Sequence, residues 1–242
     1  MSAHVPGNSV PVAGQMLSVS ETSVASLISR LIHSLRQAPI TIAIVVLSAV
    51  AQCSGALTDL WQYSTGEGST LTGIVSQAFT CHLTHWSGSQ FFWDVIAFAV
   101  LGYLCEQAGR LRYAGCLLLS MIAVTCSVMW VHPDLASYRG LSGIDSALFA
   151  MLACLITERG WRSRDRMWTI AGAAAWALFV GKVVHELVSH GTMFVEATGS
   201  FTPLPVTHVA GAIAGTFTWA VAWMVSPPSA PKTNNAVELV PG

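Results

Sequence analysis

Apolar residues gather in six long runs that polar segments separate. A helix needs about 20 mainly apolar residues to cross a bilayer, with a range of about 17 to 25. Each run reaches that length with few charged residues. The runs cover residues 38–57, 90–107, 112–131, 141–157, 167–184 and 205–225. This pattern predicts an all-α membrane protein, built as a bundle of six transmembrane helices.

Two different segments precede the first run. Residues 1–19 are rich in Gly, Pro and Ser, a composition that predicts disorder. Over residues 20–36, apolar residues such as Leu27 and Leu31 recur at helical spacing, which predicts an amphipathic helix on a membrane surface. A helix docked on protein would show the same pattern. The predicted parts are a cytoplasmic tail with this helix, the six-helix domain and a disordered cytoplasmic tail, over residues 1–37, 38–225 and 226–242.

Composition supports the membrane assignment. The chain has 242 residues, of which 53% are hydrophobic and 10% charged, and its mean hydropathy is +0.58. Soluble domains carry about 25% charged residues. The formal net charge is −1 and no strong basic face is visible, so we expect the lipid bilayer, and no nucleic acid, as a partner. The six cysteines show no CxxC spacing, and we expect no cofactor.

The arginines mark the orientation of the chain in the membrane. They lie before the first run, between the second and third, and between the fourth and fifth, at Arg30, Arg36, Arg110, Arg112, Arg159, Arg162, Arg164 and Arg166. The other three loops contain only Arg139 and no lysine. Because cytoplasmic loops are enriched in Lys and Arg, this asymmetry predicts cytoplasmic termini and places the other three loops outside.

Four polar side chains lie in the first turns of the runs that enter from the outer side: Gln90, Asp94, Ser142 and His208. Polar groups at membrane depth are costly and usually functional. Ser142 by itself would be typical of a helix serine bonded to a backbone carbonyl, and His208 by itself of a packed histidine. Their occurrence at one level of separate helices indicates a site.

Small residues connect the fourth run to the sixth. Gly143 and Ala147 begin a small face on the fourth run, and Gly211 and Gly215 form a GxxxG face on the sixth. Such faces let two helices approach closely. This packing would bring the serine hydroxyl near the imidazole. A serine becomes a strong nucleophile when a base takes its proton, and histidine suits that role near neutral pH.

Gln90 and Asp94 lie four residues apart and so share one face of the second run. Gln90 has an amide that can donate to a developing oxyanion. Asp94 donates only when it is protonated, which burial favours; a structural carboxylate is the alternative. The backbone N–H of Ser142 is a further candidate donor. His82 and His85 precede this run, but no tight ligand spacing is present and we expect no metal.

The segment from His185 through Glu186 to His190 resembles the HExxH motif of zinc proteases with one residue too many. Histidines five residues apart point about 140° away from each other on a helix, so they do not share a metal. We expect these residues at the outer end of the fifth run, with Lys182 snorkelling or paired with Glu186. Asp145 fits the first turn of the fourth helix, where an acid interacts favourably with the helix dipole. Alternatively, it could orient the histidine of the sixth run.

The motifs resemble those of the rhomboid intramembrane serine proteases. Gly140-Leu-Ser142-Gly143 is similar to their Gly-x-Ser-Gly motif, and His208 with Gly211 and Gly215 to their catalytic histidine motif. The resemblance implies a rhomboid-like six-helix fold with a catalytic Ser142–His208 dyad. It implies Gln90 and Asp94 as oxyanion- or substrate-stabilising residues. The supporting positions are His85, Gly140, Gly143, Gly211 and Gly215.

The second run extends the resemblance and adds departures from it. Bacterial rhomboids carry His, His, Asn, Gly and Glu where this chain has His85, Gln90, Asp94, Gly102 and Glu106. The segment from His85 to Asp94, with its His-Trp-Ser and Trp-Asp pairs, resembles the rhombosortase subfamily. Ser146 stands where many rhomboids have a tyrosine. The Trp-Arg motif of the first rhomboid loop is not evident.

The resemblance implies an intramembrane serine endopeptidase of the bacterial inner membrane, with a site that opens to the periplasmic side. It would cleave membrane-anchored or C-terminally tailed exported proteins, including GlyGly-type sorting signals. The alternative is a catalytically inert rhomboid-like protein that binds transmembrane helices. A small transporter is disfavoured, because charges deep in several runs and internal repeats are not found. The oligomeric state is not predicted.

Overall fold

The computed structural model describes residues 26, 29, 36–64, 70–189 and 204–225. The chain divides into two compact units, Met1–Pro39 and Ile40–Gly242. The disorder that the sequence predicts for residues 1–19 and 226–242 falls outside the described residues, as does most of the predicted amphipathic helix. Ser26, Ser29 and Arg36 are helical.

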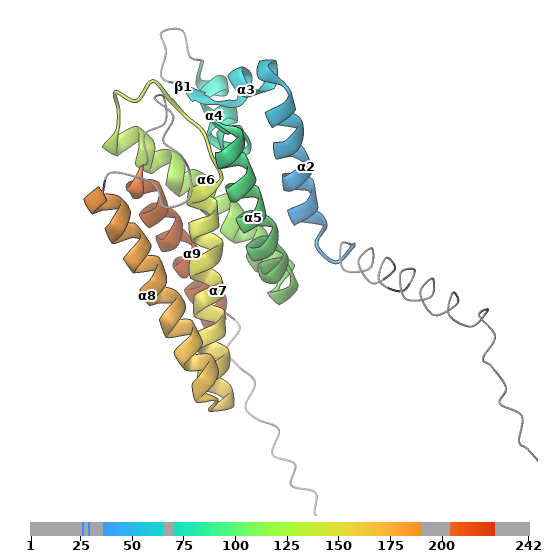
Figure 1. Ribbon diagram of the computed structural model, residues 1–242, viewed down its shortest axis with the longest axis vertical. Coiled ribbons are helices and arrows are strands. Elements are labelled where there is room, and N and C mark those ends of the chain that lie inside the picture. Colours follow the sequence, from blue (N-terminus) through green and yellow to red (C-terminus); the bar gives the residue numbers. More distant parts are fainter. Residues whose placement is uncertain (1–25, 27–28, 30–35, 65–69, 190–203, 226–242) are drawn as a thin grey trace, which may run out of the picture. The chain divides into compact units, whose positions relative to one another are not determined.

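Helices make up nearly all of the described part of the second unit, and the long ones run side by side (Figure 1). Between them lie a short 3₁₀ turn, η1 (Cys81–Leu83), and two strands, β1 (Tyr63–Ser64) and β2 (Ser137–Tyr138). The helices are α2 (Pro39–Cys53), α3 (Gly55–Trp61), α4 (Leu71–Thr80), α5 (Gly88–Ala108), α6 (Arg110–Val131), α7 (Ser142–Ser163), α8 (Arg166–Ser189) and α9 (Pro205–Val225).

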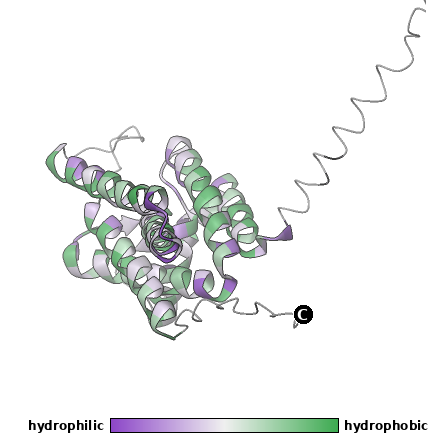
Figure 2. Cartoon of the chain, turned by 90° about the horizontal axis from the view of Figure 1, so that it is seen from below, coloured by the Kyte–Doolittle hydropathy of each residue, from purple (hydrophilic) through white to green (hydrophobic). Residues whose placement is uncertain are grey.

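Four of the described helices, α5, α6, α8 and α9, are long and apolar enough to cross a membrane. The pair α2 and α3 adds a fifth if it is one span, bent by 113° at a break. Figure 2 shows that hydrophobic residues, in green, occupy much of these helices. Many of their large apolar side chains are exposed to the surroundings, among them Val100, Leu118, Leu178, Ile213 and Phe217. The helical membrane fold is therefore supported, whereas the count of six spans stays a prediction.

Helix α7 occupies the fourth predicted run but is not one of these four apolar helices. It carries Asp145, Glu158 and Arg159, which lower its hydropathy. It packs against α5, α6, α8 and α9, and its first turns, from Gly143 to Met151, are almost entirely buried. Because its neighbours cover it, α7 does not have to present an apolar surface to lipid. This makes α7 the central helix of the bundle.

A buried carboxylate fixes the start of α2 against α5. Glu106 accepts hydrogen bonds from the backbone N–H groups of Ile40 (3.1 Å) and Thr41 (2.9 Å), and from the Thr41 hydroxyl (2.8 Å). The first N–H groups of a helix have no partner within the helix, and a carboxylate there also suits the helix dipole. Gly102 leaves room for the hydroxyl of Tyr113 beside this contact. The arrangement explains a charged residue inside an apolar run.

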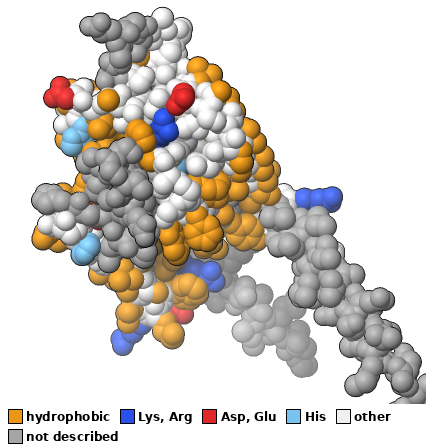
Figure 3. All heavy atoms as spheres, turned by 45° about the horizontal axis from the view of Figure 1, so that its top comes forward, with side chains coloured by type: hydrophobic (Ala, Val, Ile, Leu, Met, Phe, Trp, Pro, Cys, Tyr) orange, Lys and Arg blue, Asp and Glu red, His pale blue; other side chains and the backbone are white. Residues whose placement is uncertain are grey.

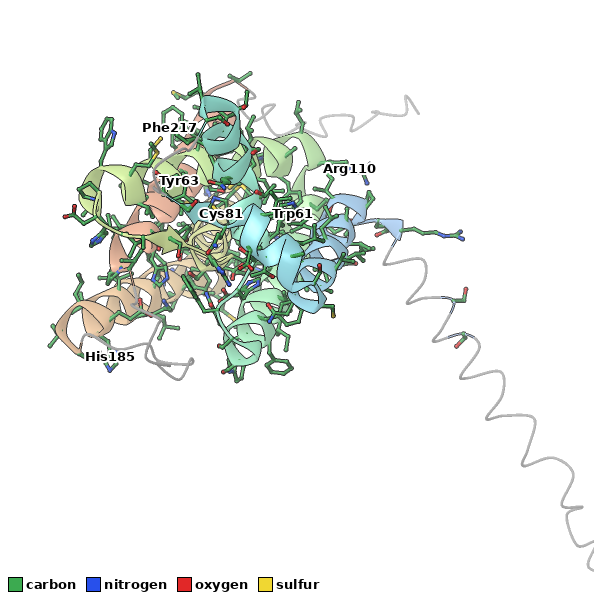
Figure 4. The ribbon with its side chains drawn as sticks, turned by 90° about the horizontal axis from the view of Figure 1, so that it is seen from above. Trp61, Tyr63, Cys81, Arg110, His185 and Phe217 are labelled. Atoms are coloured by element: carbon green, nitrogen blue, oxygen red, sulfur yellow. The ribbon has the colours of Figure 1, made fainter. Side chains whose placement is uncertain are left out.

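The segment before α5, for which the sequence predicts only an outer loop, contains α3, α4, η1 and β1. Strand β1 pairs antiparallel with β2, so that Tyr63 lies opposite Tyr138. Arg139 donates to the side-chain oxygen of Gln62 (2.7 Å) and stacks over the ring of Trp86 at 4.4 Å. These contacts attach the chain before α7 to the segment that contains α3, α4, η1 and β1. Figure 4, a view from above, shows Tyr63 and Cys81 of this segment near the middle of the view.

Candidate active site

Gly140 brings the backbone before Ser142 close to α5. Its φ of +133° lies in a region that favours glycine. A Cβ at this position would lie 2.6 Å from Nε2 of Gln90 and 3.5 Å from Oδ2 of Asp94. Position 140 therefore requires glycine for two reasons: the backbone conformation, and the lack of space for a side chain beside Gln90. The structure thus places the two polar residues of α5 beside the peptide that leads into the candidate nucleophile.

The amide of Gln90 is held in one orientation. Its Oε1 accepts a hydrogen bond from the backbone N–H of Trp86 at 2.9 Å. Ser87 caps α5 by accepting from the backbone N–H of Gln90 at 3.1 Å. With the oxygen held by Trp86, the NH₂ group faces the Gly140 backbone. Gln90 is only 2% exposed, so this donor lies in a site from which most solvent is excluded.

Helices α7 and α9 are in direct backbone contact along their small faces. A Cβ on Gly211 would overlap the carbonyl oxygen of Gly143, and one on Gly215 would overlap that of Ala147. A Cβ on Gly143 would lie 3.2 Å from the carbonyl oxygen of Thr207. The first turns of the two helices, which carry the candidate serine and histidine, therefore lie against each other. The small residues pack as their spacing in the sequence indicates.

Two side chains of α8 contact the imidazole of His208. Nδ1 lies 2.8 Å from Oε2 of Glu186 and 3.1 Å from Nζ of Lys182. Lys182 also donates to Oε1 of Glu186 at 2.7 Å. Pairing of Lys182 with Glu186, one of the two predicted alternatives, is confirmed. The contact of this pair with His208 was not predicted from the sequence, although an i,i+4 charge pair within an apolar helix was a signal for it.

The remaining residues of the HExxxH segment do not join this cluster. Figure 4 shows His185 at the outer edge of the bundle, and its side chain is exposed. His190 lies outside the described residues. Asp145 is buried in α7, where Lys182 interacts electrostatically with it and with Asp94. The structure shows no hydrogen bond between Asp145 and His208. The carboxylate that contacts Nδ1 of His208, and could orient the ring, is that of Glu186.

Several buried polar atoms near Asp94 have no hydrogen-bond partner among the described residues. They are both ring nitrogens of His85, Oδ2 of Asp94 and Oδ1 of Asp145. Nε2 of His85 lies 3.5 Å from Oδ2 of Asp94. Burial lowers the pKa of His85 to about 3, so its imidazole is neutral at physiological pH. Buried polar atoms are normally paired, which makes this group suited to receive polar atoms of a ligand.

His82 has a structural position beneath the peptide before Ser142. Its Nδ1 lies 3.4 Å from the carbonyl oxygen of Gly140, and its Nε2 lies 3.2 Å from that of Met121 in α6. Burial lowers its pKa to about 4. Among the residues that the structure describes, no group of three His, Cys, Asp or Glu side chains is arranged to hold a metal ion. His82 instead ties the Gly140 backbone to α6.

A comparison with protein-family models identifies this architecture. The model described as the Rhomboid domain matches residues 72–226, from α4 to the end of α9. No curated protein matches the chain. The match covers well over half of the chain and includes both of the helices in close backbone contact. Together with the apolar helices it makes the molecule an integral membrane protein. The chain belongs to the rhomboid family, the family of the intramembrane serine proteases.

Proposed function

We propose that this rhomboid protein is an intramembrane serine endopeptidase with Ser142 as nucleophile and His208 as general base. The observation that carries the proposal is the backbone contact between α7 and α9, which brings the first turns of both helices together. Glu186 and Lys182 engage Nδ1 of His208. Nε2 is then the ring nitrogen that takes the serine proton, as in other serine hydrolases.

The reaction follows from these positions. Ser142 Oγ attacks the substrate carbonyl carbon while His208 takes its proton. The imidazolium then donates that proton to the leaving amine as the C–N bond breaks. Water, deprotonated by the same imidazole, then attacks the acyl carbon, and the imidazolium returns the proton to Ser142 Oγ as the ester bond breaks and the acyl group leaves as a carboxylic acid. The Gln90 amide and the Ser142 backbone N–H donate to the oxyanion, and Asp94 adds a donor when protonated.

The substrates we propose are membrane-anchored or C-terminally tailed exported proteins, cleaved near the periplasmic face of a bacterial inner membrane. The sequence resemblance of the segment from His85 to Asp94 to rhombosortases supports GlyGly-type tails. A transmembrane helix hides its peptide bonds in its own hydrogen bonds, so helix-breaking residues near its outer end would ease access.

Labelling with a fluorophosphonate tests the nucleophile. We expect membranes with the wild-type protein to label, with the adduct on the Ser142 peptide by mass spectrometry. Ser142→Ala should not label, and His208→Ala should label at least roughly 100-fold more slowly. Ser163→Ala changes an exposed serine at the other end of α7 and is expected to label normally. Equal labelling of wild type and Ser142→Ala would refute the proposal.

Co-expression with an exported protein that carries a GlyGly-type C-terminal tail tests the substrate class. We expect cleavage next to the GlyGly pair, mapped at the mature C-terminus, and no cleavage by Ser142→Ala. A probe-reactive enzyme that leaves this tail intact, yet cleaves another membrane-anchored protein, contradicts the rhombosortase assignment alone.

The second candidate function is a catalytically inert binder of transmembrane helices. The glutamine at position 90 and the aspartate at position 94 favour it, because bacterial rhomboids carry His and Asn there. Such a protein would bind a transmembrane peptide equally well with Ser142→Ala and would not react with the probe. The labelling experiment therefore separates the two functions.

A further inference from the structure

Two side chains of opposite charge meet at one nitrogen of His208. The Glu186 carboxylate lies 2.8 Å from Nδ1, and the Lys182 ammonium lies 3.1 Å from the same atom. The two also pair with each other at 2.7 Å, through the other carboxylate oxygen. Glu186 and His208 are 3% and 7% exposed. The Lys182 side chain is 30% exposed, so bulk water screens its charge more than it screens the buried contact between Glu186 and His208.

A neutral imidazole carries one N–H, so Nδ1 either donates or accepts. When Nδ1 donates to Glu186, Nε2 has a lone pair and can take a proton from serine. When Nδ1 accepts from Lys182, Nε2 carries the hydrogen and cannot act as a base. The carboxylate and the ammonium therefore favour opposite tautomers of the same residue. The carboxylate is the closer of the two, which favours the tautomer that can act as a base.

We propose that Glu186 is a positioning residue that completes a Ser142–His208–Glu186 triad, and that Lys182 restrains its effect. This inference rests on the proposed function. Glu186 holds Nδ1 as a donor and stabilises the imidazolium formed during acylation, in the way that the acid of a serine-protease triad does. Lys182 opposes that stabilisation while it neutralises the carboxylate in the apolar surroundings of α8.

The other helices around His208 bring few further charges. Helix α7 contributes Asp145, and α5 contributes Asp94, both of which interact electrostatically with Lys182. The outer half of α6, residues 121–131, contains no Asp, Glu, Lys or Arg. Glu186 and Lys182 are therefore the charged groups in direct contact with the imidazole, and their separate removal should affect the histidine in opposite ways.

The test is the rate of fluorophosphonate labelling of the purified full-length protein in detergent between pH 5 and 9. In Glu186→Gln we expect the plateau rate to fall roughly 100-fold or more. The acidic limb of its profile should move about one unit to lower pH, because the imidazolium loses its carboxylate. Glu186→Asp should recover part of the rate. In Lys182→Met, which lacks the charge that opposes the imidazolium, the plateau rate should rise by up to about threefold, and the acidic limb should move to higher pH.

His185→Ala is the matched control. His185 is the neighbour of Glu186 in the sequence, but its side chain is exposed. It should reproduce the wild-type profile, and thermal midpoints should verify that each variant is folded. If Glu186→Gln does not fold, the upward shift in Lys182→Met remains the deciding measurement. The inference is overturned if Lys182→Met keeps the wild-type pH profile, or if both variants shift in the same direction. In either case, labelling of the wild type still upholds the proposed function. Loss of Ser142-dependent labelling in wild type overturns the proposed function itself.

Discussion

Gln90 shows how a single side chain adapts a family site. Its oxygen is held by the N–H of Trp86, so its NH₂ group is presented beside the Gly140 backbone. An amide keeps its N–H donors throughout the physiological pH range, whereas the charge and the tautomer of a histidine change with its protonation. Gln90 therefore suits stabilisation of an oxyanion over a wide pH range, which departs from the histidine that bacterial rhomboids carry at this position.

Replacement of Gln90 by alanine should remove this donor. We expect the fluorophosphonate labelling rate to fall roughly 100-fold, since loss of one oxyanion donor costs about 10²–10³ in rate. The thermal midpoint should change little in comparison. Gln107→Ala, an exposed glutamine near the other end of α5, serves as the control and should label normally. Unchanged labelling of Gln90→Ala would assign the amide a purely structural role.

Because His82 is buried, we expect the folded protein to lose stability at acidic pH. Burial lowers its pKa to about 4, whereas an unfolded histidine titrates near about 6.5. Between these values the unfolded state binds the proton and the folded state does not, so stability is complete above about pH 6.5 and falls as the pH falls. From pH 7 to pH 5 this one group should cost about 2 kcal/mol.

The measurement is the thermal midpoint in detergent as a function of pH. We expect His82→Asn to have a lower midpoint at pH 7.5 but a shallower loss between pH 7 and 5 than wild type. His185→Ala, on an exposed histidine, should keep the wild-type slope. Parallel slopes for His82→Asn and wild type would show that His82 does not cause the sensitivity.

Between whole elements, the contact of α7 with α9 depends on two glycines. A methyl group on Gly211 or Gly215 would overlap a carbonyl oxygen of α7. Backbone atoms cannot rotate away as a flexible side chain can, so the helices would have to separate. The serine and the histidine lie at the end of this contact, and a small separation would disturb their geometry.

Gly211→Ala and Gly215→Ala should therefore lower both the labelling rate and the thermal midpoint, with a loss of about 1–3 kcal/mol in stability each. Gly181→Ala on α8 is the matched control, because a Cβ there meets nothing within 4 Å. Helix propensity favours alanine, so that variant should be as stable as wild type or more so. Wild-type labelling by Gly211→Ala would contradict a functional role of the close contact.

Prediction from the sequence succeeded where local pattern decides. The apolar run at residues 90–107 became α5, Gly88–Ala108, because length and hydropathy are local properties. The β1–β2 pair was missed, since two-residue strands depend on partners far along the chain. The contact of Glu186 with His208 was also missed, because it depends on how α8 is rotated against α9. Periodicity fixes the faces of one helix and not their pairing.

Charge is distributed unevenly along the long axis of the bundle. Arg110 and Arg112 begin α6, while Arg162 and Arg166 lie where α7 ends and α8 begins. At the opposite end, Arg139 is paired with Asp59 at 3.3 Å, and Figure 3 shows few charged side chains on that face. Ser142 and His208 start their helices at this arginine-poor end. The distribution agrees with the orientation predicted from the sequence, in which the proposed active site opens to the periplasmic side.

Reporter fusions test this orientation. A fluorescent protein fused after Gly242 should fluoresce, because it folds in the cytoplasm, and alkaline phosphatase at the same point should be inactive. Phosphatase fused after Asp134, in the segment between α6 and α7, should be active, because the sequence places that segment outside. Substitution of Arg110 and Arg112 by serine serves as the charge control and should weaken this asymmetry. An active phosphatase after Gly242, with an inactive one after Asp134, would place Ser142 on the cytoplasmic side and exclude exported proteins as its substrates.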